Sequence, residues 1–139
     1  MEIKQLFRDP LVVVLPAAHP LGKEKYISIG QLEQEPFLLL KSGCESLVIN
    51  AFQENELSMN TQLEIADNST LISMVEAGIG VTIVPSMILP STPVNVVVKP
   101  LIPSLVREVG LVVRSQQLLS PIVTAFIEEA QNGLEEFMK

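Results

Sequence analysis

The chain has 139 residues, of which 47% are hydrophobic and 18% charged, enough apolar material for one globular domain with a core, so a disordered tail is excluded. Nine Lys and Arg against sixteen Asp and Glu give a formal net charge of −7, and no stretch gathers the basic residues into a stripe that would neutralise phosphates. Direct nucleic-acid binding by these residues is therefore not expected.

Cysteine content and apolar runs bear on the cellular compartment. The single cysteine, Cys44, cannot form an internal disulfide, which favours a reducing compartment. The amino-terminal residues lack the apolar core of a secretory signal. The longest apolar runs, 11–18 and 37–40, are far shorter than the roughly 20 residues needed to cross a bilayer. The sequence therefore predicts a soluble cytoplasmic protein with no membrane partner.

The first predicted elements are two buried strands and a helix. Residues 11–15 form a continuous β-branched run between prolines, and residues 37–40 repeat the pattern, as in strands at the centre of a helix-covered sheet. Ser28 begins a short helical turn between them. After Gly43, apolar residues at three- and four-residue intervals predict a helix that runs to about Leu57 and lies on the sheet.

The middle of the chain has the pattern of a strand, a helix and a second strand. Residues 61–65 alternate polar and apolar side chains, and residues 67–69 offer three consecutive candidates for a helix N-cap. Gly78 can end the helix in the left-handed conformation, and residues 80–84 then form a buried strand. The short connections favour parallel pairing and an α/β sheet.

The last predicted elements are short strands and a terminal helix. A short helix is expected near residues 86–89, and strands are expected at 94–98 and 109–113. The helix that begins at Pro121 places four apolar residues near one face: Ile122, Phe126, Leu134 and Phe137.

Two motifs in this order resemble LysR-type bacterial transcription regulators. Residues 9–22, DPLVVVLPAAHPLG, followed by the helical turn and the strand PFLLL at 36–40, resemble the opening of the second subdomain of their effector domains. Residues 68–85, NSTLISMVEAGIGVTIVP, follow the family's pattern of a helix ending in Val-x-x-Gly-x-Gly and a strand ending in proline. The similarity extends over almost the whole chain.

The resemblance implies an α/β fold like that of type II periplasmic binding proteins, in which a ligand binds between two subdomains. Residues 1–139 would be a partial effector-binding domain, with about 10–101 forming the second subdomain and about 107–139 returning into the first. DNA would be read by an N-terminal winged helix-turn-helix, which these residues do not contain. The strand at 109–113 and the terminal helix would lack packing partners, which predicts a homodimer or higher oligomer.

Ligand contacts are expected first in the loop of Ser42, Gly43, Cys44, Glu45 and Ser46. It lies where a strand ends and a helix begins, the place where open α/β sheets bind ligands, and the resemblance also puts effector contacts here. Helix capping alone is the alternative for the two serines. The charge of Glu45 would repel an anionic effector.

A second helix N-terminus, at Asn68, Ser69 and Thr70, is predicted to face the same cleft, although helix capping explains these residues about as well. Gly78-Ile79-Gly80 follows a helix instead of a strand, so a tight helix-to-strand passage explains it better than a dinucleotide-binding loop. His19, the only histidine, has no visible partners for a triad or a metal site and is interpreted as structural. No catalytic residue, metal ligand or cofactor is predicted.

For two further kinds of candidate residue, an ordinary structural role is the alternative to a functional one. Cys44 at a helix N-terminus suggests a thiol redox sensor, as in peroxide-sensing members of the family, but the chain has no second cysteine, so Cys44 is interpreted as a small residue lining the loop. Arg107 and Arg114 flank the returning strand and are interpreted as solvated charges, with pairing to an acidic effector as the alternative.

The predicted function is binding without catalysis. A small-molecule effector favours one arrangement of the two subdomains and so changes how the full-length regulator presents its DNA-binding helices. Three alternatives stay open. A solute-binding receptor of the same fold would carry an export signal, an enzyme such as a dehydratase of aromatic precursors would need a clustered acid or base pair, and an oligomerisation module would bind no small molecule.

Overall fold

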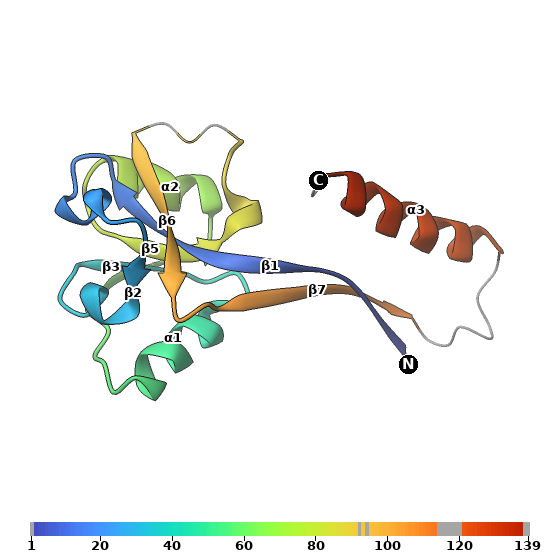
Figure 1. The fold of residues 1–139 in the computed structure, drawn as a ribbon, viewed down its shortest axis with the longest axis horizontal. Coiled ribbons are helices and arrows are strands. Elements are labelled where there is room, and N and C mark those ends of the chain that lie inside the picture. Colours follow the sequence, from blue (N-terminus) through green and yellow to red (C-terminus); the bar gives the residue numbers. More distant parts are fainter. Residues whose placement is uncertain (1, 92, 94, 114–120, 138–139) are drawn as a thin grey trace. The chain divides into compact units, whose positions relative to one another are not determined.

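The computed structural model describes residues 2–91, 93, 95–113 and 121–137, which belong to two compact units. The larger unit is Pro10–Arg107, and the smaller one combines Met1–Asp9 with Glu108–Lys139. In chain order the elements, with η for a 3-10 helix, are β1 (Glu2–Pro16), η1 (Pro20–Lys23), β2 (Ile27–Ser28), η2 (Ile29–Leu32), β3 (Phe37–Leu40), α1 (Glu45–Glu54), β4 (Thr61–Ile65), α2 (Asn68–Glu76), β5 (Thr82–Pro85), η3 (Ser86–Ile88), β6 (Val96–Ile102), β7 (Val106–Val113) and α3 (Pro121–Phe137) (Figure 1).

The larger unit contains strands that run in both directions. β1 pairs antiparallel with β5 and β6, and β2 pairs parallel with β6. β4 pairs parallel with β3. A parallel bridge joins Phe37 to Val81, and the N–H of Leu38 donates to the carbonyl oxygen of Val81 at 2.9 Å. The strands on either side of α2 are therefore parallel, as predicted, but they do not pair with each other, because β3 lies between them.

Alternation along the strands creates two apolar faces, because successive side chains point to opposite sides of a sheet. One core contains the strand residues Leu11, Val13, Leu15, Phe37, Leu39 and Ile83 together with Val48, Ala51 and Phe52 of α1. The other contains Val14, Leu38, Leu40 and Val84 together with Leu71, Ile72 and Val75 of α2. The two helices thus cover opposite faces of the strands (Figure 1). The predicted burial of runs 11–15 and 37–40 in a helix-covered sheet is confirmed for every residue except Val12, which is half-buried.

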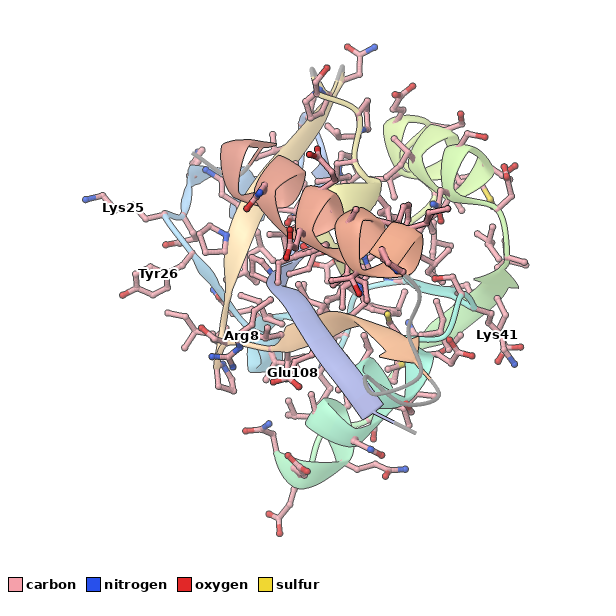
Figure 2. The ribbon with its side chains drawn as sticks, turned by 90° about the vertical axis from the view of Figure 1, so that its right-hand side faces the viewer. Arg8, Lys25, Tyr26, Lys41 and Glu108 are labelled. Atoms are coloured by element: carbon pink, nitrogen blue, oxygen red, sulfur yellow. The ribbon has the colours of Figure 1, made fainter. Side chains whose placement is uncertain are left out.

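The first strand is longer than the predicted run of residues 11–15. β1 begins at Glu2, since its first half pairs with β7 far along the chain. Within the larger unit, the N–H of Leu11 donates to the carbonyl oxygen of Leu105 at 2.8 Å. In the smaller unit, Nε of Arg8 lies 4.0 Å from Oε1 of Glu108, and both exposed side chains are labelled in Figure 2.

Other elements differ from prediction mainly in extent. α1 ends at Glu54 instead of near Leu57, because Nδ2 of Asn55 donates to the carbonyl oxygen of Ala51 at 2.7 Å and Glu56 turns the chain with a φ of 56°. β6 extends to Ile102, beyond the predicted strand at 94–98, and the first residue of that prediction, Val94, lies outside the described residues.

The terminal helix α3 begins at Pro121, as predicted. Ile122 and Phe126, four residues apart, are 82% and 63% exposed, whereas Ile127 is 6% exposed. The side chains of Leu134 and Phe137, which complete the predicted apolar face, lie outside the described residues. In the described ranges, no helix combines the length and the apolar character that a bilayer span requires.

Candidate functional site

The carboxyl ends of the parallel strands meet at one edge of the larger unit. β3 and β4 end side by side, and the N–H of Lys41, which follows β3, donates to the carbonyl oxygen of Ile65 at 2.8 Å. β5 ends at Pro85, opposite Leu11. Leu11 is also bonded to Leu105, so the residues just before β7 lie at this edge of the larger unit as well. Open α/β sheets bind ligands at such an edge.

The loop between β3 and α1 carries the first set of predicted site residues. Ser42, Gly43 and Ser46 are exposed, and Gly43 has a φ of 104°, which glycine adopts without strain. Cys44 is 7% exposed and is the N-cap residue of α1, with no capping hydrogen bond from its side chain. Neither Ser42 nor Ser46 is therefore the N-cap residue of α1, the role that the sequence left as an alternative for them.

The carboxylate of Glu45 lies at the N-terminus of α1 and places a negative charge there. Its Oε2 accepts a hydrogen bond from the N–H of Gly43 at 2.8 Å. Hydrogen bonds from the backbone N–H groups of Glu45 and Gly43 hold the pKa of this carboxyl below its ordinary value. An anionic ligand would have to compete with this carboxylate, as the sequence suggested.

The loop between β4 and α2 is organised by Asp67, the N-cap residue of α2. Its Oδ2 accepts hydrogen bonds from the hydroxyl of Thr70 at 2.7 Å, the N–H of Thr70 at 2.9 Å and the hydroxyl of Ser69 at 2.8 Å. Helix capping therefore engages Ser69 and Thr70, the alternative that the sequence left open. Asn68, Ser69 and Thr70 are all exposed, and the first two also line a pocket beside α2.

Asp67→Ala is expected to lower the unfolding temperature at neutral pH, with an effect that becomes smaller in acid. Hydrogen bonds from the side chain and N–H of Thr70 and from the Ser69 hydroxyl lower the pKa of Asp67 from 3.8. The stabilisation is therefore present above pH 3.8 and is lost as the pH falls through the lower pKa of the folded state. Thermal unfolding of both proteins from neutral to acid pH tests this, and a constant difference across the series would contradict it.

Arg107 reaches the first loop from the start of β7. Its Nη1 lies 3.9 Å from Sγ of Cys44, and its side chain is half-buried instead of solvated. This corrects the interpretation of Arg107 as a solvated charge, while Arg114 lies outside the described residues. In the sequence, the feature of Arg107 that pointed to a possible role was its position at the beginning of the strand that returns to the first subdomain.

His19 has structural contacts, as interpreted from the sequence. Its Nδ1 accepts a hydrogen bond from the N–H of Leu21 at 3.1 Å, and its Nε2 lies 3.1 Å from Oε2 of Glu35. These contacts begin η1 and tie it to the segment before β3. Across the part of the chain that the structure describes, no three His, Cys, Asp or Glu side chains are grouped so as to hold a metal ion.

The Gly78-Ile79-Gly80 segment is a tight passage from α2 to β5. Gly78 has a φ of 81°, the left-handed conformation predicted for it. A Cβ atom at Gly80 would lie 2.6 Å from the carbonyl oxygen of Pro36. The second glycine thus allows the chain to approach the segment that enters β3, which supports the interpretation of a tight connection.

Relatives of known sequence are transcription regulators. YvbU, an uncharacterized HTH-type transcriptional regulator of Bacillus subtilis strain 168, is 32% identical over 133 residues, which cover 94% of this chain and 46% of YvbU. CmpR, an HTH-type transcriptional activator of Synechocystis sp. PCC 6803, is 38% identical over 85 residues, 60% of this chain and 28% of CmpR. The chain therefore spans less than half the length of these relatives.

Solved structures share the fold. The regulatory domain of CcmR from Synechocystis PCC6803, in complex with 2-PG, matches with a TM-score of 0.79 at 20% identity, over 94% of this chain and 65% of that chain. The predicted α/β fold of the type II periplasmic-binding-protein kind is confirmed. The family model described as the LysR substrate binding domain matches residues 1–135. The chain therefore belongs to the LysR substrate binding domain family, the effector-binding part of LysR-type transcription regulators.

Proposed function

We propose that this chain senses a small-molecule effector through the loops 42–46 and 68–70, on behalf of a LysR-type transcription regulator. The observation that carries the proposal is that both loops start at the same edge, where Lys41 and Ile65 are hydrogen-bonded. Support comes from the family to which the chain belongs and from the fold it shares with the CcmR domain, which was solved with 2-PG. Catalysis has no part in this function.

The mechanism we propose is a shift between arrangements of two subdomains. The second subdomain would comprise about residues 10–101, and residues 107–139 would return into the first; the division into two compact units supports this. An effector that binds one arrangement more tightly shifts the equilibrium by that difference in affinity. We propose that the regulator acts as a homodimer inside the cell. DNA binding would reside in the part of the relatives' length that the match to this chain does not cover.

The chemistry of the first loop constrains the effector. The exposed hydroxyls of Ser42 and Ser46 do not cap α1 and suit hydroxyl or carbonyl groups of a ligand. The carboxylate of Glu45 disfavours a second anion at Gly43, whereas the guanidinium of Arg107 beside Cys44 favours an acidic group in its reach. We propose a hydroxylated metabolite whose acidic group, where it has one, lies on the Arg107 side of the loop.

Ser42→Ala is expected to weaken effector binding by up to about tenfold, the effect of one hydrogen bond. Native mass spectrometry of the full-length regulator against small hydroxy acids, sugars and amino acids would find the ligand and rank the variants. Ser58→Ala is the matched control, since Ser58 is exposed between α1 and β4, away from this edge.

The outcomes of this screen separate the alternatives. Equal affinity of the two variants would move the site away from loop 42–46. A regulator that binds nothing in the screen and keeps its oligomeric state would support the oligomerisation module instead.

A further inference from the structure

One edge of β6 is only partly covered by another strand. On its inner side, β6 pairs with β1 from Val96 to Pro100. On its outer side, β2 contributes two residues, which pair with Leu101 and Ile102. Among the residues that the structure describes, no strand pairs with the outer edge of residues 96–98.

The pairing with β1 determines which backbone groups face outward. In an antiparallel pair, opposite residues alternate between those that exchange hydrogen bonds and those that do not. The N–H of Ala17 donates to the carbonyl oxygen of Asn95 at 3.2 Å, one position beyond the last pair of the ladder. Counting from this bond, the N–H and C=O groups of Val97 point toward β1, and those of Val96 and Val98 point outward. The backbone hydrogen bonds of the described part of the chain include none to these outward groups.

The side chains at this edge suit an extended neighbour. Val96, Val97 and Val98 are half-buried, and valine is among the residues that favour β-strands. Tyr26 and Ile102 are 55% and 43% exposed at the end of this edge where β2 begins. Figure 2 shows the ring of Tyr26 extending away from the ribbon. An added strand would therefore find apolar contacts beside the unpaired backbone groups.

Three lysines gather around the same edge. Lys99 belongs to β6, Lys23 is the last residue of η1, and Lys25 precedes Tyr26 (Figure 2). Within the described ranges none of the three has a salt bridge. Glu24 is the one carboxylate between Lys23 and Lys25, so positive charge exceeds negative charge here, whereas the chain as a whole has a net charge of −7. This excess favours an acidic partner.

We propose that the outer edge of β6 at residues 96–98 binds an extended, acidic segment of a partner protein, which adds a strand to the sheet. Its backbone exchanges hydrogen bonds with Val96 and Val98, and its carboxylates lie near the three lysines. A second copy of the chain is a poorer occupant, because it would bring the same lysines against one another. The edge lies in the larger unit and uses none of the residues proposed to contact the effector.

The test titrates the isotope-labelled 139-residue chain with two peptides that differ only in charge, acetyl-EVTVE-amide and acetyl-KVTVK-amide. The acidic peptide is expected to move the amide signals of Val96 and Val98 in NMR spectra and to slow their hydrogen exchange. Its dissociation constant is expected in the millimolar range for so short a strand. The basic peptide is expected to bind at least about fivefold more weakly. Equal binding of the two peptides, or unmoved signals of Val96 and Val98, would overturn the proposal.

Val98→Pro tests the hydrogen bonds of the edge. It removes an N–H that points outward, so the pairing with β1 is kept, and Pro100 already occupies the equivalent position two residues later. Binding of the acidic peptide is expected to fall at least about fivefold while the midpoint of urea unfolding changes little. A folded variant that binds the peptide as tightly as the parent chain would contradict a strand added at this edge.

Lys25→Gln tests the charge independently of the backbone. It is expected to weaken binding of the acidic peptide about twofold to threefold and to leave binding of the basic peptide no weaker. Lys41→Gln is the matched control, because Lys41 is also exposed but follows β3, which is not a neighbour of β6. Equal losses in the two variants would overturn the assigned charge contact. Signals of Val96 and Val98 that move with protein concentration alone would identify a second copy as the occupant and would also overturn the proposal.

Discussion

Replacing Phe52 by alanine is expected to destabilise the chain by about 3–5 kcal/mol, a large part of the stability of a domain of this size. Phe52 is 1% exposed and lies between α1 and the strands, in the core that also contains Phe37. The two rings meet edge to face, with centroids 5.6 Å apart and an angle of 75° between planes. The substitution removes this aromatic contact and leaves a cavity that the neighbouring strands cannot fill.

Urea denaturation followed by circular dichroism measures this loss. Phe126→Ala is the matched control, because Phe126 is 63% exposed and its truncation is expected to change the unfolding free energy by less than about 0.5 kcal/mol. If the two variants unfolded at similar urea concentrations, the assignment of Phe52 to the core would be wrong. The candidate loop 42–46 would be affected too, since Phe52 anchors the helix that this loop begins.

Gly80→Ala is expected to destabilise the chain by about 3 kcal/mol, although it adds a single methyl group. The new Cβ would lie 2.6 Å from the carbonyl oxygen of Pro36 and 3.2 Å from Cγ of Leu38. The carbonyl cannot move away without loss of the hydrogen bond that it accepts from the N–H of Val81 at 2.9 Å. Faster amide exchange at Leu38 and Val81 would be the local sign of this separation.

Gly133→Ala distinguishes this clash from a general effect of replacing glycine. Gly133 lies in α3 with no atom within 4 Å of the added Cβ, so alanine is expected to stabilise that helix by about 0.5–1 kcal/mol. Gly78→Ala has the same free space but a φ of 81°, so it is expected to be destabilising through backbone strain alone. A loss at Gly80 no larger than the loss at Gly78 would exclude the clash.

The local pattern of the chain was enough to predict the buried strands and the helices next to them. Residues 37–40 are apolar at every position because both faces of β3 are covered, by α1 on one side and α2 on the other. The end of α2 could also be predicted from a local feature. The left-handed φ at Gly78 is a conformation that glycine adopts without strain. The position of both candidate loops at strand ends follows from the same local reasoning.

Features that depend on distant pairs of residues could not be predicted in this way. The first half of β1 mixes polar and apolar residues without a continuous apolar run, and it becomes a strand because β7, about a hundred residues later, pairs with it. The contact of Arg107 with Cys44 joins residues 63 positions apart, so an isolated arginine at a strand end gave only its location. The pocket beside α2 combines a helix with a turn that follows the next strand.

The alternation of side chains in the buried strands also governs how the chain tolerates insertions and deletions. Adding one residue between Phe37 and Leu39 would put these two side chains on opposite faces, and so direct one of them into the layer of α2. An insertion in loop 42–46 or in the loop before α2 leaves this register intact, because each lies beyond the end of its strand. The loops proposed to contact the effector are thus the segments in which evolution can change length and ligand preference without rebuilding the interior.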